Sequence, residues 1–447
     1  MTDAPRTHRS SFPHGLSRRS VVAAFAATGS VAALAACAPG SSGGSKASGD
    51  SGGTLRVSTW GNDSRLKLTQ QAAAEFEKAN PGIKVTVENS EWTNYWDKLA
   101  TSTAANDSPD VIQMDEAYIA AYGTRGALLD LDTVKSQLDL SEMDSKVLDT
   151  GKVEDKLVGA PIGVGNFSVG VNPTVLQQAG VEMPDDTKWT WEEFAALATQ
   201  VSAKLGAQGV VGFDGYGTGT AEVGAWVRQF KQEIFPTKEQ TAADEATVTS
   251  YFEYADALVA SGATPQASVQ SENSTAALDA SLFATNKAAF HLQFHTQISA
   301  FAAASGNELK LLRLPAQKTG ESPRMVNKAS MYWSISARTK QSENAAKFVD
   351  FMLTDPAATK ILTTERGVPA IPSVQKDIEP VLSPQSKIVL AFSQAIASEV
   401  VDPPQVTPSG ASAWNTEFTT IGTDQLFGRT KPADAAKNAL TTAKGMV

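Results

Sequence analysis

The sequence predicts an α/β protein in which parallel strands alternate with helices. Residues 54–59 alternate apolar and polar side chains as a strand does, and a helical pattern with one apolar face follows them. The alternation of strand and helix then continues to residue 114, which gives the order strand–helix–strand–helix–strand. Helices of this length between strands are typical of a doubly wound sheet, whose ligands bind at the carboxyl ends of the strands.

The first helix is expected to be capped by Ser64 and to bury Ala72, Phe76 and Ala79 along one face. Pro and Gly at positions 81 and 82 end it. The elements expected next are a strand over 83–87, a helix over 95–105 and a strand over 110–114. The carboxyl ends of the three strands therefore lead to Trp60, Trp92 and Asp115.

Three later stretches are short, extended and rich in Gly or Pro. Residues 158–165 contain too many glycines for the interior of a central strand, but they suit a segment that passes between two lobes. Residues 311–315 and 367–372 contain Pro and stand at suitable positions for return crossings. The chain of 447 residues is long enough for two or three domains at about 150 residues each.

Composition excludes several classes of function. Hydrophobic residues make up 42% of the chain and charged residues 19%, which is typical of a globular protein. The net charge of −10 opposes binding to nucleic acid or to anionic lipid. One cysteine allows neither a disulfide framework nor a cysteine metal cage. Outside the N-terminal leader only His291 and His295 could serve a zinc site or a Ser-His-Asp triad.

The N-terminus is predicted to be a secretion signal over residues 1–36. Arg18 and Arg19 precede an apolar run over 21–36 that is short for a membrane span. The run ends in Leu-Ala-Ala-Cys, which resembles a bacterial lipobox and implies that Cys37 is acylated; the alternative is a buried thiol. The Arg pair also resembles a twin-arginine signal, so the choice between twin-arginine and general secretory export stays open.

After Cys37, residues 38–53 are almost entirely Gly, Ser and Ala. Such a tether is flexible, with a root-mean-square reach of roughly 20–25 Å. Residues 37–53 are therefore predicted to be a lipidated tether that holds the protein at the extracellular face of the bacterial cell membrane, through lipid only.

Several stretches of the chain after residue 53 match one protein family. Their order and spacing resemble the extracellular solute-binding proteins (family 1) of carbohydrate ABC importers, the group that includes maltose-binding protein. The matching stretches are 59–61, 76–85, 108–112, 126–131, 171–173, 190–194 and 345–354. The resemblance covers nearly all of the chain from Thr54 to the end.

The resemblance implies a two-lobed clamp of the periplasmic-binding-protein type (type II). Each lobe would be a mainly parallel sheet flanked by helices, and the three crossings would be the hinges. The implied lobes are 54–162 with 326–370 and 163–325 with 371–447. The family also implies a monomer without enzymatic activity, cofactor or metal, which passes a mono- or oligosaccharide to the membrane permease subunits of an importer.

A sugar site needs flat aromatic rings for the C–H faces of the sugar and polar side chains for its hydroxyls. By strand alternation, one residue of the pair Tyr332 and Trp333 should face the cleft. For Asp115 the alternative role is a helix cap, for Trp226 it is core packing, and for Arg366 it is a solvated hinge charge. The candidates in the first lobe are Trp60, Asn62, Asp63, Trp92, Tyr95, Asp115, Tyr118, Tyr332, Trp333 and Arg366. The candidates in the second lobe are Asn166, Asp214, Tyr216, Trp226, Gln293, His295 and Trp414.

Other readings of the same residues are weaker. His291 and His295 stand four residues apart, as metal ligands can, but no dependable third ligand accompanies them. The sequence does not decide whether His291 lies in the cleft or in the core. A glycoside hydrolase would need two carboxylates, for which Asp63, Asp115 and Asp214 are candidates, but no hydrolase motif appears. A non-sugar solute is the third reading, and a uronic acid could bind through Arg366. Eight tryptophans favour a sugar, and several candidate platforms favour an oligosaccharide. Trp96 and Trp191 are expected in the core.

Overall fold

The computed structural model of this protein describes residues 53–238 and 240–447. The expected secretion signal, the lipidation site Cys37 and the tether up to residue 52 lie outside the described residues. The described residues belong to one compact unit, Asp50–Val447. None of the helices in this range has both the length and the hydropathy that a membrane crossing requires.

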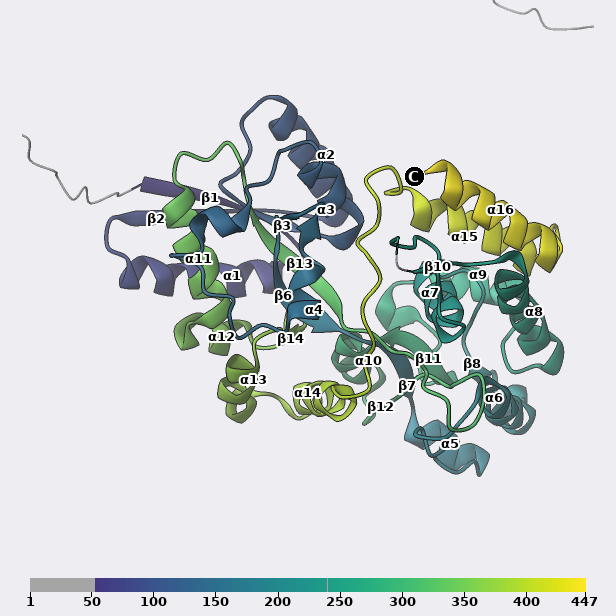
Figure 1. Cartoon of the computed structure of the whole chain (residues 1–447). Helices are drawn as coiled ribbons and strands as arrows, with labels where there is room; N and C mark the ends of the chain where they lie inside the picture. The colour runs from purple at the N-terminus through teal and green to yellow at the C-terminus, as the bar shows by residue number, and fades with distance from the viewer. Residues whose placement is uncertain (1–52, 239) are drawn as a thin grey trace, which may run out of the picture. The chain divides into compact units, whose positions relative to one another are not determined.

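A six-stranded sheet in the order β14-β6-β13-β3-β1-β2 forms the centre of the first lobe (Figure 1). The strands are β1 Gly53–Trp60, β2 Ile83–Ser90, β3 Val111–Met114, β6 Ala160–Gly165, β13 Lys328–Ile335 and β14 Val368–Pro369. The helices are α1 Asp63–Ala79, α2 Trp92–Ala104, α3 Glu116–Gly123, α4 Ser145–Asp149, α11 Ser342–Thr354 and α12 Pro356–Leu362. The helix α13 Pro372–Ile378 follows β14 and packs against α12. A small hairpin pairs β4 Lys152–Val153 with β5 Lys156–Leu157.

The predicted strand–helix–strand–helix–strand order at the start of this lobe is confirmed. Strands β2 and β3 both run parallel to β1, on either side of it. The predicted cap is wrong, because the N-cap of α1 is Asn62 and not Ser64. The Asn62 side chain accepts a hydrogen bond from the Arg65 N–H at 3.0 Å, whereas Ser64 already lies within the helix. Phe76 of α1 packs edge-on against Phe348 of α11 at 5.2 Å, which joins two helices that are distant in sequence.

A four-stranded sheet in the order β12-β7-β11-β8 forms the centre of the second lobe. Its strands are β7 Phe167–Val171, β8 Val211–Phe213, β11 Ala288–Phe294 and β12 Lys310–Leu312. The helices are α5 Pro173–Ala179, α6 Trp191–Leu205, α7 Thr220–Gln229, α8 Glu245–Ser261, α9 Ala267–Thr275, α10 Ile298–Ser305, α14 Pro384–Ile396, α15 Trp414–Leu426 and α16 Pro432–Gly445. A separate pair joins β9 Gln232–Glu233 to β10 Thr241–Ala242, and 3-10 helices occupy Leu131–Val134, Gly206–Gln208, Leu278–Ala280, His295–Gln297 and Glu379–Val381.

The expectation of mainly parallel sheets is wrong, because both sheets are mixed. In the first lobe β13 runs antiparallel to β3 and to β6, and β14 runs antiparallel to β6. In the second lobe β7 runs antiparallel to β11 and to β12, and the β11–β8 pair is parallel. The crossings account for two of these pairs. The chain leaves the first lobe along β6 and returns along β13, and it enters the second lobe along β7 and leaves along β12, so the strands of each pair run in opposite directions.

The change of sheet at the first crossing comes at Asn166, between β6 and β7. The chain returns to the first sheet between β12 and β13, and it leaves that sheet for the last time after β14. All three predicted extended segments therefore contain strands.

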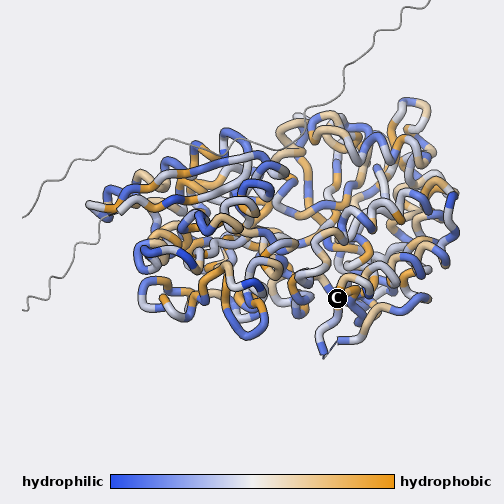
Figure 2. The backbone as a smooth tube through the Cα atoms, turned by 90° about the horizontal axis from the view of Figure 1, so that it is seen from above, coloured by the Kyte–Doolittle hydropathy of each residue, from blue (hydrophilic) through white to orange (hydrophobic). Residues whose placement is uncertain are grey.

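Hydrophobic side chains fill the interior of each lobe. The backbone coloured by hydropathy shows hydrophobic segments inside both halves and hydrophilic segments toward the periphery (Figure 2). The expected core residues Trp96 and Trp191 are 7% and 4% exposed, so their prediction is confirmed. Large side chains such as Phe194, Phe290 and Trp333 are completely buried.

Candidate functional site

A pocket of about 480 Å³ lies between the two sheets and receives side chains from both lobes. This volume is within the usual range for small-molecule sites, about 300–1,000 Å³. The first lobe contributes Glu116 at the start of α3 and Lys328, Ala329 and Tyr332 of β13. The second lobe contributes Leu292 and Phe294 of β11, the start of α7 from Thr220, and Trp414 and Asn415 of α15.

The segment between α14 and α15 passes between the lobes and forms another wall of this pocket (Figure 1). Its Val401 N–H donates to the Met325 carbonyl at 2.9 Å, and the Gln405 amide donates to the Phe235 carbonyl at 3.0 Å. The Thr407 hydroxyl donates to Glu116 Oε1 at 2.6 Å. Residues 401–407 therefore contact both lobes and set the width of the pocket from one side.

Aromatic rings supply much of the apolar surface of the pocket. Trp414 and Phe235 meet edge-on with ring centroids 5.6 Å apart, and Phe167 and Phe294 meet at the same distance. Tyr332 adds a ring from the first lobe that is fully buried, and Trp414 is 7% exposed, whereas Phe167, Phe235 and Phe294 are partly exposed. Partly exposed rings offer the surface on which the C–H side of a sugar packs.

Charged groups stand among these rings. Glu116 Oε2 lies 3.5 Å from Lys328 Nζ, and Lys328 lies 5.4 Å above the ring of Phe294. Enclosure in the pocket lowers the pKa of Lys328, but the carboxylates of Glu116 and Asp115 outweigh it, so the pKa lies above its ordinary value. Burial raises the pKa of Asp115, against the opposing effect of Lys328. The first lobe thus presents an ion pair with hydrogen-bonding capacity toward the pocket.

The acidic groups on the second-lobe side are already bound within the protein. Glu222 Oε2 accepts hydrogen bonds from the Gly217 N–H at 2.9 Å and from the Tyr251 hydroxyl at 2.9 Å. Burial raises the pKa of Glu222 despite these donors. The Arg228 guanidinium donates hydrogen bonds to both carboxylate oxygens of Glu233, at 2.8 and 3.3 Å. The two side chains are only 10% and 11% exposed. This bidentate pair is fixed in place where α7 meets β9.

Two of the sequence candidates, Tyr332 and Trp414, line this pocket. Tyr332 and its neighbour Trp333 alternate along β13, and Tyr332 is the one directed to the pocket, whereas Trp333 packs 6.4 Å from Phe348. Burial raises the pKa of Tyr332 well above its ordinary range, and the Thr150 hydroxyl opposes that shift.

Four further candidates, together with the expected core residue Trp96, form a cluster of rings in the first lobe. We call it the first-lobe aromatic cluster, and its members are Trp60, Trp92, Tyr95, Trp96 and Tyr118. Trp60 contacts Trp92 and Tyr95 at 5.2 and 5.1 Å, and Trp96 stacks on Tyr118 at 3.8 Å. Trp92 is 43% exposed, while Trp60 is 7% exposed. Val406, which lines the pocket, packs against the buried hydrophobic cluster that contains Trp60, Tyr95, Trp96 and Tyr332.

Three polar candidates of the first lobe lie at the starts of helices. Asn62 caps α1, and Asp63 occupies the first turn of that helix in an exposed position. Asp115 caps α3 by accepting a hydrogen bond from the Ala117 N–H at 2.9 Å. The cap role considered for Asp115 is therefore present, and it places the carboxylate beside Glu116 of the pocket.

Tyr216 and Trp226 belong to a second group of rings, which we call the second-lobe aromatic cluster: Trp191, Tyr216, Trp226, Tyr251 and Tyr254. Trp226 is 4% exposed and Tyr216 is 3% exposed. The Trp226 indole N–H donates to the Ser250 hydroxyl at 3.0 Å, and its ring lies 5.1 Å from that of Tyr254. The rings come from α6, α7, α8 and the segment before α7, and they pack against one another.

Asn166, Gln293 and His295 are buried together at the first crossing. The Asn166 N–H donates to His295 Nδ1 at 2.9 Å, and the His295 N–H donates back to the Asn166 carbonyl at 2.8 Å. The Asn166 amide also donates to the Val326 carbonyl at 2.9 Å, which ties two crossings to each other. Burial lowers the pKa of His295 to about 3, so its ring is neutral at pH 7.

Asp214 lies in the second lobe and is 2% exposed. Its Oδ2 lies 2.8 Å from Nδ1 of His291, whose ring stacks on Phe283 at 5.3 Å. None of the three carboxylates considered for a hydrolase, Asp63, Asp115 and Asp214, is among the residues that line the pocket.

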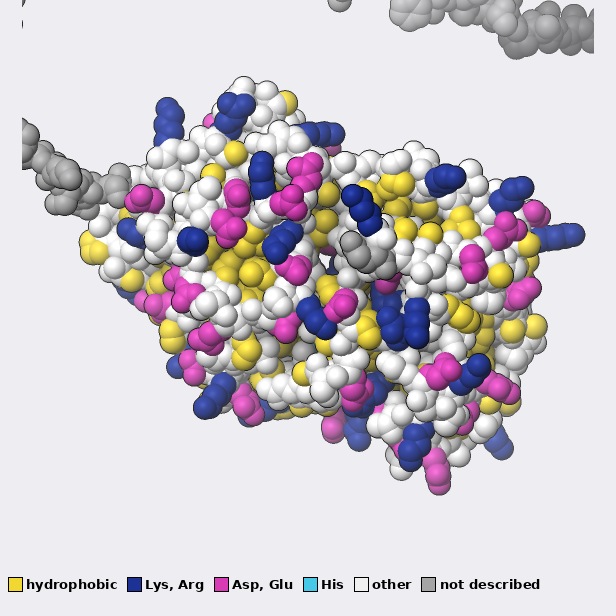
Figure 3. Space-filling model, in the orientation of Figure 1, with side chains coloured by type: hydrophobic (Ala, Val, Ile, Leu, Met, Phe, Trp, Pro, Cys, Tyr) yellow, Lys and Arg dark blue, Asp and Glu magenta, His cyan; other side chains and the backbone are white. Residues whose placement is uncertain are grey.

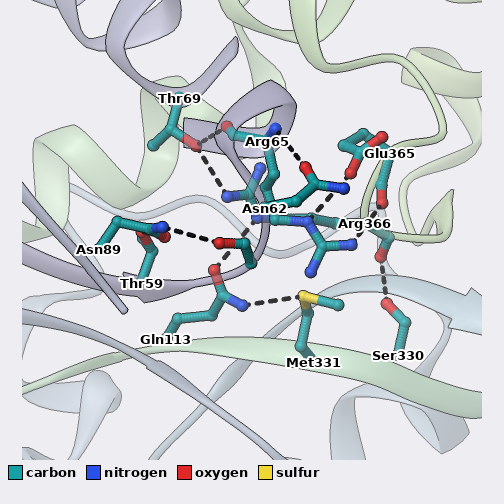
Figure 4. A network of polar contacts seen from close by, with 11 residues as sticks. Thr59, Asn62, Arg65, Thr69, Asn89, Gln113, Ser330, Met331, Glu365 and Arg366 are labelled. Atoms are coloured by element: carbon teal, nitrogen blue, oxygen red, sulfur yellow. Dashed lines mark hydrogen bonds and ion pairs between the residues drawn. The ribbon is translucent and has the colours of Figure 1, made fainter. Parts of the chain in front are cut away.

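Arg366 lies at the third crossing inside a polar network (Figure 4). Its guanidinium donates to Gln113 Oε1 at 3.2 Å and to the Thr69 hydroxyl at 2.8 Å, and the Ser330 hydroxyl donates to its carbonyl. The alternative role of Arg366 as a solvated charge at the hinge is wrong, because the residue is 3% exposed. Burial, with a smaller effect from Arg65, lowers its pKa to about 9. The network binds α1, β3, β13 and β14 to one another.

Several pocket residues are absent from the sequence candidates. Glu116 and Lys328 were missed because their role arises from a pairing across 212 positions of chain. Phe235 and Phe294 were missed because an isolated Phe carries no signal of exposure. The Pro-rich stretch before Thr407 was visible in the sequence, but nothing there showed that it contacts both lobes.

The sequence profile described as bacterial extracellular solute-binding protein matches residues 71–387, well over half of the chain. The chain belongs to this family. The expected family resemblance is thereby confirmed, and this family comprises substrate-binding proteins, not enzymes.

A multiple sugar-binding protein of Streptococcus mutans is 24% identical to this solute-binding protein over 336 residues, which cover 71% of this chain and 75% of that protein. An extracellular solute-binding protein of family 1 from Alicyclobacillus acidocaldarius has a TM-score of 0.69 at 25% identity, over 88% of this chain and 98% of that one. A periplasmic oligogalacturonide binding protein from Yersinia enterocolitica, in complex with saturated digalacturonic acid, has a TM-score of 0.74 at 22% identity over the same shares of the two chains. These likenesses confirm the predicted two-lobed α/β fold.

Proposed function

We propose that this solute-binding protein captures an oligosaccharide outside the cell and delivers it to the membrane permease subunits of an ABC importer. The ligand lies in the pocket between the two sheets, and the protein acts as a monomer. Acylation of Cys37 anchors it to the extracellular face of the membrane, with residues 38–53 as the tether.

The observation that carries this proposal is the lining of the pocket. Aromatic rings from both lobes, Tyr332 from one and Trp414 with Phe235 from the other, stand together with hydrogen-bonding groups such as Glu116 and Lys328. This combination matches the two faces of a sugar, whose C–H groups pack on rings and whose hydroxyls need polar partners. The names of the relatives, a multiple sugar-binding protein and an oligogalacturonide binding protein, agree with that chemistry.

The exposed ring of Trp92 extends the proposed site beyond the pocket. Trp92 contacts Trp60 at 5.2 Å, and Trp60 shares one buried hydrophobic cluster with the pocket residue Tyr332. A sugar unit that protrudes from the pocket would meet this ring, which supports an oligosaccharide over a monosaccharide. The buried candidates Asn166, Gln293, His295 and Arg366 would act indirectly, by fixing the crossings about which the lobes move.

Closure of the lobes is part of the proposal. A ligand that touches Glu116 of the first lobe and Trp414 of the second gains its full set of contacts only when both are near, so it favours the closed arrangement. The proposed lobes are 54–162 with 326–370 and 163–325 with 371–447, with their hinges at the three crossings.

A thermal-shift screen of the purified protein against monosaccharides, oligosaccharides, polyamines and phosphate esters tests the proposal. An oligosaccharide at 100 times its dissociation constant should stabilise the fold by about 2.7 kcal/mol. A shift with polyamines alone, or with phosphate esters that contain no sugar alone, would contradict a sugar ligand. Recovery of the bound oligosaccharide uncut, checked by chromatography after incubation, separates a binding protein from the hydrolase alternative.

A further inference from the structure

A second cavity of about 430 Å³ adjoins the pocket, and we call it the basic cavity. Arg228 and Glu233 line both the pocket and the basic cavity, so the two spaces meet at this ion pair. The other residues that line the basic cavity are Lys146, Lys231, Gln240, Arg324, Val400, Val401 and Asp402. A ligand that fills the pocket therefore has the basic cavity beside it.

The described residues that line the basic cavity carry four basic and two acidic side chains. Lys146 pairs with Asp402 at 2.7 Å, and Arg228 pairs with Glu233 at 2.8 Å. Lys231 and Arg324 have no acidic partner among residues 53–238 and 240–447. This excess contrasts with the net charge of −10 of the whole chain. The space-filling view shows Lys and Arg side chains gathered near the middle of the face, beside its hollow (Figure 3).

Hydrogen bonds hold Lys231 and Arg324 near each other. The Gln229 amide, at the end of α7, donates to the Pro323 carbonyl at 3.3 Å and to the Pro315 carbonyl at 2.9 Å. This contact fastens the helix end that precedes Lys231 to the turn that contains Arg324. The Nε of Arg324 is buried without a hydrogen-bond partner in the described part of the chain.

The backbone at both residues is unusual. Lys231 has φ of 60° and Arg324 has φ of 50°, in the left-handed region where Gly and Asn are favoured. Lys231 follows the last turn of α7, a position that Gly occupies most often. Long basic side chains at two left-handed positions of one cavity are a costly arrangement of the kind found at ligand sites.

We propose that the saccharide of this protein carries an anionic group, a carboxylate or a phosphate, which binds between Lys231 and Arg324. The inference rests on the proposed function and adds the charge class of the ligand. The guanidinium fork of Arg324 donates to two oxygens of such a group, and Lys231 adds a second charge.

Calorimetric titration of the purified protein with matched pairs of sugars tests this inference. The pairs are digalacturonic acid with galactobiose, for a carboxylate, and maltose 6′-phosphate with maltose, for a phosphate. The acidic member of one pair should bind at least tenfold more tightly than its neutral counterpart, and that advantage should shrink as the salt concentration rises. Neutral members that bind as tightly as both acidic members would overturn the inference and leave the proposed function standing.

Variants locate the effect. The double variant Lys231→Asn with Arg324→Asn removes both charges and places Asn, which tolerates left-handed backbone, at both positions. It should lose at least tenfold in affinity for the acidic sugar, keep its affinity for a neutral one, and melt near the wild-type temperature. The control Lys204→Gln with Arg338→Gln removes the same charge from two exposed residues outside both cavities.

Equal losses in the double variant and in its control would overturn the inference, because they would show a general charge effect. Absence of binding by every sugar, neutral and acidic, would contradict the proposed function itself. Neutral sugars that bind as tightly as acidic ones would overturn only the inference about charge, whereas the absence of all sugar binding would contradict the proposed function. The two proposals therefore fail in distinguishable ways.

Discussion

Each lobe holds a cluster of aromatic rings, and the two clusters differ in how much of their surface solvent reaches. In the first-lobe aromatic cluster Trp92 is 43% exposed. In the second-lobe aromatic cluster Trp226 and Tyr216 are 4% and 3% exposed, and the Trp226 N–H is bonded to Ser250 within the lobe. The same residue type thus serves as a surface ring in one lobe and as a packed ring in the other.

The comparison shows what decides the role of an aromatic residue in this fold. Trp92 stands at the first position of α2, where the chain has just left the edge strand β2. Trp226 stands within α7 among buried neighbours on both sides, such as Val223 and Val227. A ring at the start of a helix near the sheet edge keeps a free side, whereas a ring in the middle of a covered helix has none.

The largest expected effect comes from Trp226→Ala. Removal of a packed indole should lower the free energy of unfolding by about 3–5 kcal/mol, because it leaves a cavity. Urea unfolding measures this loss, and calorimetry should find the sugar affinity of the folded variant nearly unchanged. A variant that unfolds like the wild type but binds sugar weakly would show that Trp226 is a platform after all.

The next effect concerns His295 and the stability of the crossings at low pH. Its pKa is about 3 in the folded protein and about 6.5 when unfolded, so between these values the unfolded chain binds a proton that the folded one does not. The contribution of neutral, buried His295 to the free energy of unfolding is therefore fully present above pH 6.5 and is lost as the pH falls toward 3. By pH 4.5 the loss should be roughly 2–3 kcal/mol.

His295→Asn keeps an acceptor for the Asn166 N–H but does not titrate. Urea unfolding of both proteins from pH 7 to pH 4.5 should therefore show a smaller decline for the variant than for the wild type. Parallel declines would mean that His295 is not held neutral by its burial.

The smallest of the three effects is expected for Trp92→Ala. Loss of an exposed stacking ring should weaken binding of an oligosaccharide by about 1–2 kcal/mol, which is about tenfold in affinity. The stability should change little, because the ring is 43% exposed. Calorimetric titration and thermal melting measure the two quantities. A large loss of stability with unchanged affinity would place Trp92 in the core and remove the contrast with Trp226.

Much of the fold was predictable because it depends on local patterns. The alternation of residues 54–59 and the apolar face of α1 fix the parallel start of the first sheet, and Pro and Gly mark the crossings. Strand direction after the crossings was not predictable from these patterns, because it depends on where the returning chain re-enters a sheet. The cap of α1 differed by two positions because Asn62 and Ser64 are both suitable capping residues.

The site was less accessible to sequence reasoning than the fold. Strand alternation, which is a local rule, predicted that one of Tyr332 and Trp333 faces the cleft but not which of the two. The ion pair of Glu116 with Lys328 and the wall formed by residues 401–407 depend on contacts between distant parts of the chain, which no local pattern records. Exposure of a ring is likewise a property of packing, so the count of tryptophans indicated the class of ligand but not the contact residues.

The structure of the protein bound to the oligosaccharide that gives the largest thermal shift is the decisive measurement of where the ligand binds. We expect electron density for the sugar in the pocket between the sheets, in contact with Trp414 or Phe235 of the second lobe and with Tyr332 or Glu116 of the first. A sugar bound outside this pocket, or one that touches residues of a single lobe, would show that the proposed site is wrong.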